Sequence, residues 1–125
     1  MDKNIVKVDN APAAVGAYSQ GVSVNGTYYF SGMLGLDPST MELKEGFDGQ
    51  VAQIMTNIDA VLSGSSLNRE NVVKTTVFVT DLKDFPQVNQ AYEAFFTKPY
   101  PARSCVQVSA LPKGAAVEIE VVAVG

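Results

Sequence analysis

Hydrophobic residues recur along this chain with two spacings, one typical of helices and one typical of strands. Residues 47–64 and 84–97 place apolar side chains three or four positions apart. That spacing lines one side of an α-helix, so we expect two helices, each with one apolar face. The apolar positions are Val51, Ile54, Met55, Ile58, Val61 and Leu62 in the first helix and Val88, Ala91, Tyr92, Phe95 and Phe96 in the second.

Acidic residues, glycine and proline set the expected ends of both helices. Asp48 and Asp84 are candidate N-terminal caps, because a side-chain oxygen can accept hydrogen bonds from the free N–H groups of the first turn. Pro86 fits the first turn of the second helix. Gly64 is expected to end the first helix, and Pro99 stops the second.

Runs rich in β-branched and aromatic residues predict the strands. Residues 4–8, 72–80, 102–108 and 116–124 each predict one strand. Residues 23–30 predict a hairpin, because Asn25-Gly26 supplies the two positive-φ positions of a tight turn.

The predicted strands carry apolar residues on both faces. Residues 72–80 alternate Val73, Val77 and Val79 with Val72, Thr76 and Phe78. The last strand directs Ile119, Val121 and Ala123 to one side and Glu118, Glu120, Val122 and Val124 to the other. Two helices cover only one face of a sheet, and an apolar second face must be covered as well. We expect another copy of the protein to cover it.

Composition and charge narrow the class of protein. A chain of 125 residues fits a single domain, residues 1–125. Only 18% of the residues are charged, which favours an oligomer over a monomer with a polar, uncharged exterior. The net charge is −4 and the seven lysines are scattered, so nucleic acid is disfavoured as the main partner.

The chain also lacks the signals of a secreted or membrane protein. No apolar run approaches the roughly 20 residues of a membrane span, and the polar N-terminus has no signal-peptide core. A single cysteine excludes an intrachain disulfide and fits a reducing compartment. We therefore expect a soluble, cytoplasmic protein.

Histidine is absent from the sequence. Its absence removes the commonest general base, the Ser-His and Cys-His nucleophile pairs, and most zinc sites. Acid–base chemistry would have to use Asp, Glu, Lys, Tyr or Cys.

Arg103 and Glu118 stand in two of the most apolar segments. Strand periodicity places Arg103 and Cys105 on one face of their strand, and Glu118 and Glu120 on one face of theirs. If the two faces coincide, Arg103 could hold a small organic acid while a glutamate handles a water molecule or a proton. The alternative is an Arg–Glu ion pair within the chain, which the spacing alone favours because buried charges are usually paired.

Other candidates have a functional and a structural interpretation. Cys105 fits a small core residue better than a nucleophile, since no histidine can activate it. Tyr18 is either half-buried or part of a pocket wall. Asn89 and Tyr92 are one helical turn apart and fit either a cleft or a solvated amide beside a core ring. Residues 30–35 form a glycine-rich segment at the end of a strand. Its backbone N–H groups could bind a small anion, but a plain turn is the simpler interpretation.

Four segments together resemble the reactive intermediate deaminase family (RidA, YjgF-type). They are APAAVGAYSQG at 11–21, YYFSGMLG at 28–35, VVKTTVFVTDLKDFPQVNQAYEAFF at 72–96 and YPARSCVQVSALPKGAAVEIEVVAV at 100–124. The resemblance covers essentially the whole chain. It implies an α+β, chorismate-mutase-like fold, with a mixed six-stranded sheet and two helices on one face. It also implies a homotrimer with a central β-barrel and sites in the clefts between subunits.

The resemblance further implies hydrolysis of 2-aminoacrylate and related 2-imino acids to 2-oxo acids and ammonia. Pyridoxal-phosphate-dependent dehydratases release such compounds, and no metal or cofactor is implied. Arg103 would bind the substrate carboxylate and Glu118 would orient the attacking water. Glu120 would be an interface or structural charge. The positions implied to line the pocket are Tyr18, Ser31, Asn89 and Cys105, with backbone groups from Gly32 and Cys105.

Two residues depart from the family pattern. Ala17 replaces a proline before Tyr18, which loosens that loop, and Met33 stands where a polar residue, often Gln, follows Ser-Gly. We expect Met33 to alter substrate preference. Two other functions stay open: a small-ligand-binding regulator of purine metabolism or translation, and an endoribonuclease. The acidic charge balance and the absence of histidine argue against the endoribonuclease.

Overall fold

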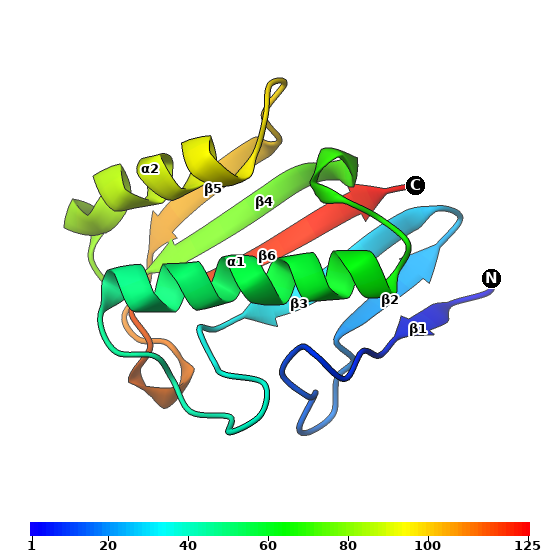
Figure 1. Cartoon of the computed structure of the whole chain (residues 1–125), viewed down its shortest axis with the longest axis horizontal. Coiled ribbons are helices and arrows are strands. Elements are labelled where there is room, and N and C mark those ends of the chain that lie inside the picture. Colours follow the sequence, from blue (N-terminus) through cyan, green and yellow to red (C-terminus); the bar gives the residue numbers. More distant parts are fainter.

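The computed structural model describes all 125 residues and builds one sheet and two α-helices (Figure 1). The strands are β1 (Asn4–Val6), β2 (Gly21–Val24), β3 (Thr27–Met33), β4 (Val72–Val79), β5 (Ala102–Gln107) and β6 (Val117–Val124). The helices are α1 (Phe47–Gly64) and α2 (Phe85–Phe95), with 3-10 turns at η1 (Arg69–Asn71), η2 (Leu82–Asp84) and η3 (Pro112–Gly114). None of the helices combines enough length and hydrophobicity to span a bilayer.

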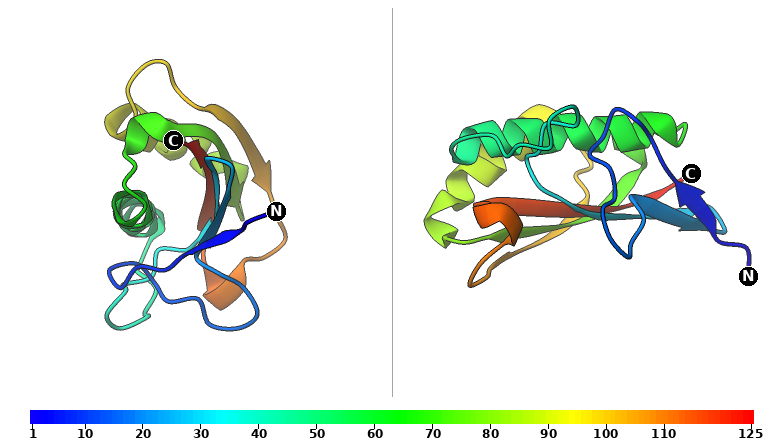
Figure 2. Two further views of the ribbon diagram at one scale, coloured as in Figure 1. Left: turned by 90° about the vertical axis from the view of Figure 1, so that its right-hand side faces the viewer. Right: turned by 90° about the horizontal axis from the view of Figure 1, so that it is seen from below.

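The sheet is mixed and has the strand order β1-β2-β3-β6-β4-β5. All neighbouring strands are antiparallel except β4 and β5, which are parallel and are joined through α2. The β2–β3 hairpin turns at Asn25 and Gly26, both with positive φ, as the sequence predicts. Both helices lie on one side of the sheet (Figure 2).

The core lies between the helices and this covered face. The apolar positions predicted for α1 are all buried, and on the sheet side every second residue of β6 is buried with them. Ile54, Ile58 and Leu62 are among the largest side chains that are fully buried. Each such side chain stabilises the fold by about 1.5–3 kcal/mol relative to an exposed one.

The opposite face of the sheet has no covering element in this chain (Figure 2). Large apolar side chains remain exposed there, with Tyr29 at 51%, Val106 at 43% and Val124 at 48% exposure. An apolar surface spread over several strands is typical of a contact with another protein chain.

Two predictions of helix capping are wrong in detail. Gly46 occupies the N-cap position of α1, and Asp48 lies within the first turn. Its charge there still complements the partial positive charge of the helix start. Asp84 takes the N-cap position of α2, but its side chain makes no capping hydrogen bond.

The sequence predicts Val73 on the same face as Val77 and Val79. This prediction is wrong, because β4 contains a bulge. Val72 pairs with Ala123 and Lys74 pairs with Val122, which leaves Val73 as an extra residue. An extra residue reverses the alternation of side chains along the strand. Val72 therefore enters the core beside Val77 and Val79, while Val73 is exposed.

Candidate active site

A second bulge interrupts β3 where it pairs with β6. Phe30 pairs with Val121 and Met33 pairs with Ile119, so β3 contains one residue more than β6 over this interval. Ser31 and Gly32 lie in the bulge. Such bulges re-aim side chains and backbone groups at the edge of a site.

The bulge brings the backbone of Gly32 against the Glu118 side chain. A Cβ atom added to Gly32 would lie 2.8 Å from Cδ and 2.9 Å from Oε2 of Glu118. Any larger residue at this position would therefore displace the Glu118 carboxyl group. The Glu118 carboxyl group consequently rests on the Gly32 backbone.

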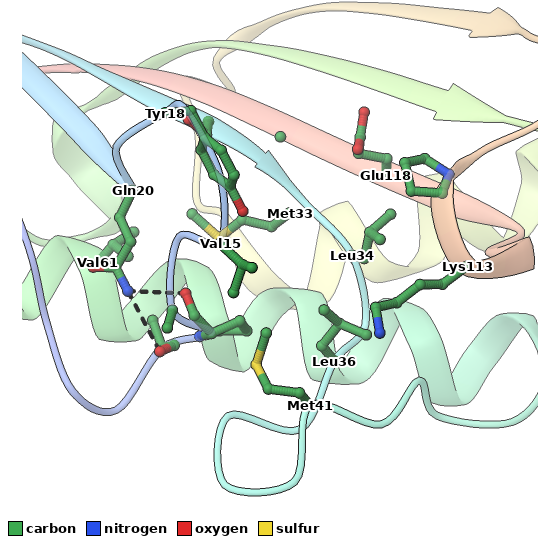
Figure 3. Close-up of a pocket in the computed structure, with 16 residues that line it drawn as sticks. Val15, Tyr18, Gln20, Met33, Leu34, Leu36, Met41, Val61, Lys113 and Glu118 are labelled. Carbon is green, nitrogen blue, oxygen red and sulfur yellow. Dashed lines mark hydrogen bonds between the residues drawn. The ribbon is translucent and has the colours of Figure 1, made fainter.

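Hydrogen bonds attach the loop of Tyr18 to the same strand. The Ser31 hydroxyl donates to the carbonyl of Ser19 at 2.6 Å. The buried side-chain amide of Gln20 donates to the carbonyl of Pro12 at 2.9 Å (Figure 3). These bonds fix the loop on both sides of Tyr18, a residue that is 54% exposed.

These elements line an open cavity of about 680 Å³ (Figure 3). We name its polar end, formed by Tyr18, Ser31, Gly32 and Glu118, the glutamate half-site. Burial raises the pKa of Glu118, and the nearby charge of Glu120 raises it further. Glu118 forms no ion pair within the chain.

Arg103 lies on the other side of the sheet, beneath α2. It is in register with Thr75 of β4, which is buried in the core face. Its guanidinium carbon lies 5.0 Å from the ring centroids of both Phe85 and Tyr92. The Tyr92 hydroxyl donates to Thr75 Oγ1 at 2.7 Å, and burial raises the pKa of Tyr92 to about 12. Arg103 is thus positioned by two rings, of which Tyr92 is buried and held by its hydrogen bond.

The two arginines of the chain have different surroundings. Arg69 pairs with Asp59 at 2.7 Å and stacks over Phe95 at 3.9 Å. Arg103 forms no ion pair with any residue of the chain. Its N–H groups are free to bind an anion, and a planar guanidinium suits a carboxylate.

Arg103 borders a cleft of about 300 Å³. We name the group formed by Asn89, Tyr92, Tyr100 and Arg103 the arginine half-site. The carboxylate of Glu93 also borders this cleft, outside ion-pair distance of Arg103. Tyr92 is buried, as expected of a core ring, and it also borders the cleft. Asn89 borders the cleft as well, as one of the two interpretations of this pair expects.

The predicted ion pair between Arg103 and a glutamate of the same chain is wrong. Arg103 is in register with Thr75, whereas Glu118 is in register with Phe78. Thr75 and Phe78 are three positions apart in β4, so their side chains point to opposite faces. The strand β4 also separates β5 from β6. The chain therefore keeps its two half-sites apart.

Cys105 shares the face of Arg103 but does not border the cleft. It is in register with the buried Val77 and packs against the core. Burial raises the pKa of the Cys105 thiol, and the nearby Arg103 only partly offsets this. A largely protonated thiol suits a packing role. No three His, Cys, Asp or Glu side chains gather closely enough to hold a metal ion.

The sequence interpretation missed three buried amides that hold segments of the chain in place around the cavity. Gln20 is one, and Gln50 and Asn57 of α1 are the others. Gln50 accepts a hydrogen bond from the Ala116 N–H at 2.9 Å, and Asn57 donates to the Leu36 carbonyl at 3.0 Å. Both amides interrupt the apolar face of α1, and this interruption was the sequence feature that could have revealed them. Buried amides at such positions usually hold a neighbouring loop.

Comparison with known proteins shows full-length similarity. Residues 8–125 match the family described as Endoribonuclease L-PSP. A RutC family protein of Aquifex aeolicus is 49% identical over 121 residues, which cover 95% of this chain and 97% of the relative. A 2-iminobutanoate/2-iminopropanoate deaminase of Salmonella typhimurium is 46% identical over 127 residues, covering 99% of this chain and 98% of the relative.

Solved structures agree with the fold. The crystal structure of RidA from the Antarctic bacterium Psychrobacter superposes with a TM-score of 0.95 at 49% identity, covering 98% of this chain and 99% of that one. The predicted fold, a mixed six-stranded sheet with two helices on one face, is confirmed.

Proposed function

Because the chain belongs to the Endoribonuclease L-PSP family, the family of the RidA deaminases, we propose that it hydrolyses 2-imino acids to 2-oxo acids and ammonia. The observation that carries this proposal is the unpaired Arg103, held against two aromatic rings at an open cleft. A guanidinium in this setting binds a small carboxylate through two parallel hydrogen bonds. The deaminase name of the Salmonella relative indicates which carboxylates to test.

We place each active site between two copies of the chain. Arg103 of one copy would meet Glu118 of its neighbour, because the two residues face opposite sides of their own sheet. The uncovered apolar face supplies a reason for the copies to associate. Three copies arranged around an axis would close these faces into a central barrel and repeat the site three times.

The proposed chemistry begins with an electrophilic C=N bond. A water molecule adds to C2 of the imine while Glu118, as a carboxylate, takes one of its protons. Glu118 returns this proton to the nitrogen to give the carbinolamine. The hydroxyl proton then passes through Glu118 to the nitrogen, the C2–N bond breaks to release ammonia, and the C2–O bond becomes the carbonyl of the 2-oxo acid. The carboxylate of the substrate stays on Arg103 throughout, so positioning supplies much of the acceleration.

The other predicted positions take supporting roles in this proposal. Tyr18 and Ser31 wall the glutamate half-site, and Asn89 borders the carboxylate beside Arg103. Gly32 and Cys105 contribute backbone groups. The substrates would include 2-aminoacrylate, released by pyridoxal-phosphate-dependent dehydratases, after a proton moves from its nitrogen to C3 to give 2-iminopropanoate.

A coupled assay tests the proposal. A serine or threonine dehydratase generates the imine, and formation of the 2-oxo acid is followed with and without the protein. We expect the protein, added in catalytic amount, to raise this rate above the spontaneous rate. An unchanged rate would contradict the proposal. Calorimetric binding of the 2-oxo acid without turnover would instead indicate a small-ligand-binding regulator.

The family description supports a second candidate, an endoribonuclease. The net charge of −4 disfavours it, because binding of RNA phosphates needs clustered basic residues. Cleavage of RNA by the purified protein, lost in Arg103→Ala, would favour this candidate over the deaminase.

A further inference from the structure

We propose that Thr75 and Tyr92 form a positioning pair for Arg103. Their buried hydrogen bond fixes the ring of Tyr92, and this ring fixes the direction in which the guanidinium meets the substrate carboxylate. The inference rests on the proposed deaminase function and assigns a role to Thr75, which lines neither half-site. Thr75 acts through Tyr92 and does not touch the substrate.

The first argument is the geometry of three neighbouring elements. Thr75 of β4 and Arg103 of β5 are in register on adjacent parallel strands, so their side chains share a face of the sheet. The Tyr92 hydroxyl of α2 donates to Thr75 Oγ1 at 2.7 Å. The guanidinium carbon of Arg103 lies 5.0 Å from the centroid of the same ring. One ring therefore joins a fixed partner on β4 to the arginine on β5.

The second argument is burial. Thr75 and Tyr92 are both buried, and theirs is the only hydrogen bond between two side chains that is fully buried in the structure. Burial raises the pKa of Tyr92 to about 12, so its hydroxyl keeps the proton at neutral pH and remains a donor. The bond is shielded from competing water and has a constant direction.

The third argument is that an apolar pair would fill the same space. Tyr92 belongs to the hydrophobic core, where phenylalanine beside a valine at position 75 would keep the shapes of both side chains. Replacing both partners of a buried hydrogen bond by apolar groups of the same shape is often nearly neutral for stability. What the polar pair adds is a single defined arrangement of the ring.

The fourth argument is that Arg103 has no polar anchor of its own. It forms no ion pair within the chain, and its guanidinium lies against the rings of Phe85 and Tyr92. Phe85 has no polar group, so Tyr92 is the ring that a hydrogen bond can lock. Binding a carboxylate through two parallel hydrogen bonds requires a correctly oriented guanidinium plane, and small displacements at such a site are costly.

Two isosteric substitutions made together test the inference. The double variant Thr75→Val/Tyr92→Phe removes both hydroxyl groups and keeps the shape of both side chains. We expect its melting temperature to stay close to the wild-type value. The KM for 2-iminobutanoate, generated by threonine dehydratase, should rise by roughly threefold to tenfold with kcat little changed. Calorimetry should show a similar loss of affinity for the product 2-oxobutanoate, which binds without turnover.

A conservative variant and a matched control accompany the double variant. Thr75→Ser keeps the hydroxyl group and should keep KM within about twofold of the wild type. The control Thr56→Val/Tyr28→Phe removes one hydroxyl group from each residue type at positions that line neither half-site. It should leave both KM and the affinity for 2-oxobutanoate unchanged.

The outcomes separate the pair from the reaction. Unchanged KM and unchanged affinity for 2-oxobutanoate in the double variant would overturn the positioning pair and leave the deaminase function intact. Equal losses in the control would overturn the pair as well. If the wild type turns over no imine but binds 2-oxobutanoate more tightly than the double variant does, only the deaminase function is removed, and the pair still positions Arg103 for a carboxylate. A wild type that neither binds 2-oxobutanoate nor turns over the imine would overturn both.

Discussion

The glutamate half-site and the arginine half-site belong to the same sheet but hold their charged residues in different ways. Glu118 lies on the open face, pressed against the bulged backbone of Gly32. Arg103 lies on the helix-covered face, against the rings of Phe85 and Tyr92. Backbone geometry positions the carboxyl group, whereas packing on α2 positions the guanidinium.

This difference keeps the two charges from neutralising each other within the chain. An arginine and a glutamate on one face of neighbouring strands would form an ion pair. Placed on opposite faces, both remain without ion-pair partners in their own chain. Under our proposal a second copy brings them together around the substrate.

The largest expected effect follows from removing the arginine of the arginine half-site. Arg103→Ala loses a bidentate, charge-assisted contact to the substrate and should lower kcat/KM by about 100-fold or more. Arg69→Ala is the control, because Arg69 stacks on an aromatic ring, pairs with Asp59 and lines neither half-site. It should lower thermal stability slightly and leave kcat/KM near the wild-type value. Equal losses in the two variants would show that Arg103 has only a structural role.

A smaller effect is expected from adding one methyl group to the glutamate half-site. Gly32→Ala would place Cβ 2.8 Å from Glu118 Cδ, so the carboxyl group must move. The moving atoms end a flexible side chain, and the melting temperature should change little. The activity should fall by roughly tenfold or more, since small displacements of a catalytic group are costly.

Gly49→Ala is the matched control for this substitution. Its Cβ would lie 3.7 Å from Lys44 Cβ, an ordinary contact, within α1. It should stabilise the helix by up to about 1 kcal/mol and leave activity unchanged. If Gly32→Ala were as active as Gly49→Ala, the position of Glu118 would not matter to the reaction.

A still smaller effect is expected from removing one of the aromatic rings that contact Arg103. Phe85→Leu keeps an apolar side chain but removes one aromatic face from the guanidinium. A cation–π contact contributes about 0.5–2 kcal/mol, so we expect KM to rise by roughly threefold to tenfold with kcat little changed. Steady-state kinetics measure this split. A fall in kcat with an unchanged KM would show that the ring does not act through substrate binding.

The smallest effect concerns the pH dependence of Glu118. Activity that requires the carboxylate is present above its pKa and is lost as the pH falls through that value. Because burial and then Glu120 raise this pKa, the acidic limb should lie above the ordinary range of a glutamate. Glu120→Gln removes the like charge, so the acidic limb of kcat/KM should move to lower pH. A limb that stays in place would mean that another group controls it.

The sequence predicted the elements well because their periodicities are strong. The apolar stripe of α1 and the Asn25-Gly26 turn both appear as expected. The bulges at Val73 and at Ser31–Gly32 could not be predicted, because a bulge depends on the pairing of two strands distant in sequence. The relative facing of Arg103 and Glu118 depends on strand register across β4, which periodicity within each strand does not determine.

Subunit complementation tests the central claim most directly. Arg103→Ala and Glu118→Gln are mixed in equal amounts, unfolded, refolded together and assayed for imine hydrolysis, with each variant refolded alone as the inactive control. If each site takes Arg103 from one copy and Glu118 from another, about a quarter of the sites in the mixture are intact, and about a quarter of wild-type activity should return. If both residues act from the same chain, the mixture will be as inactive as either variant alone, and the account will be contradicted.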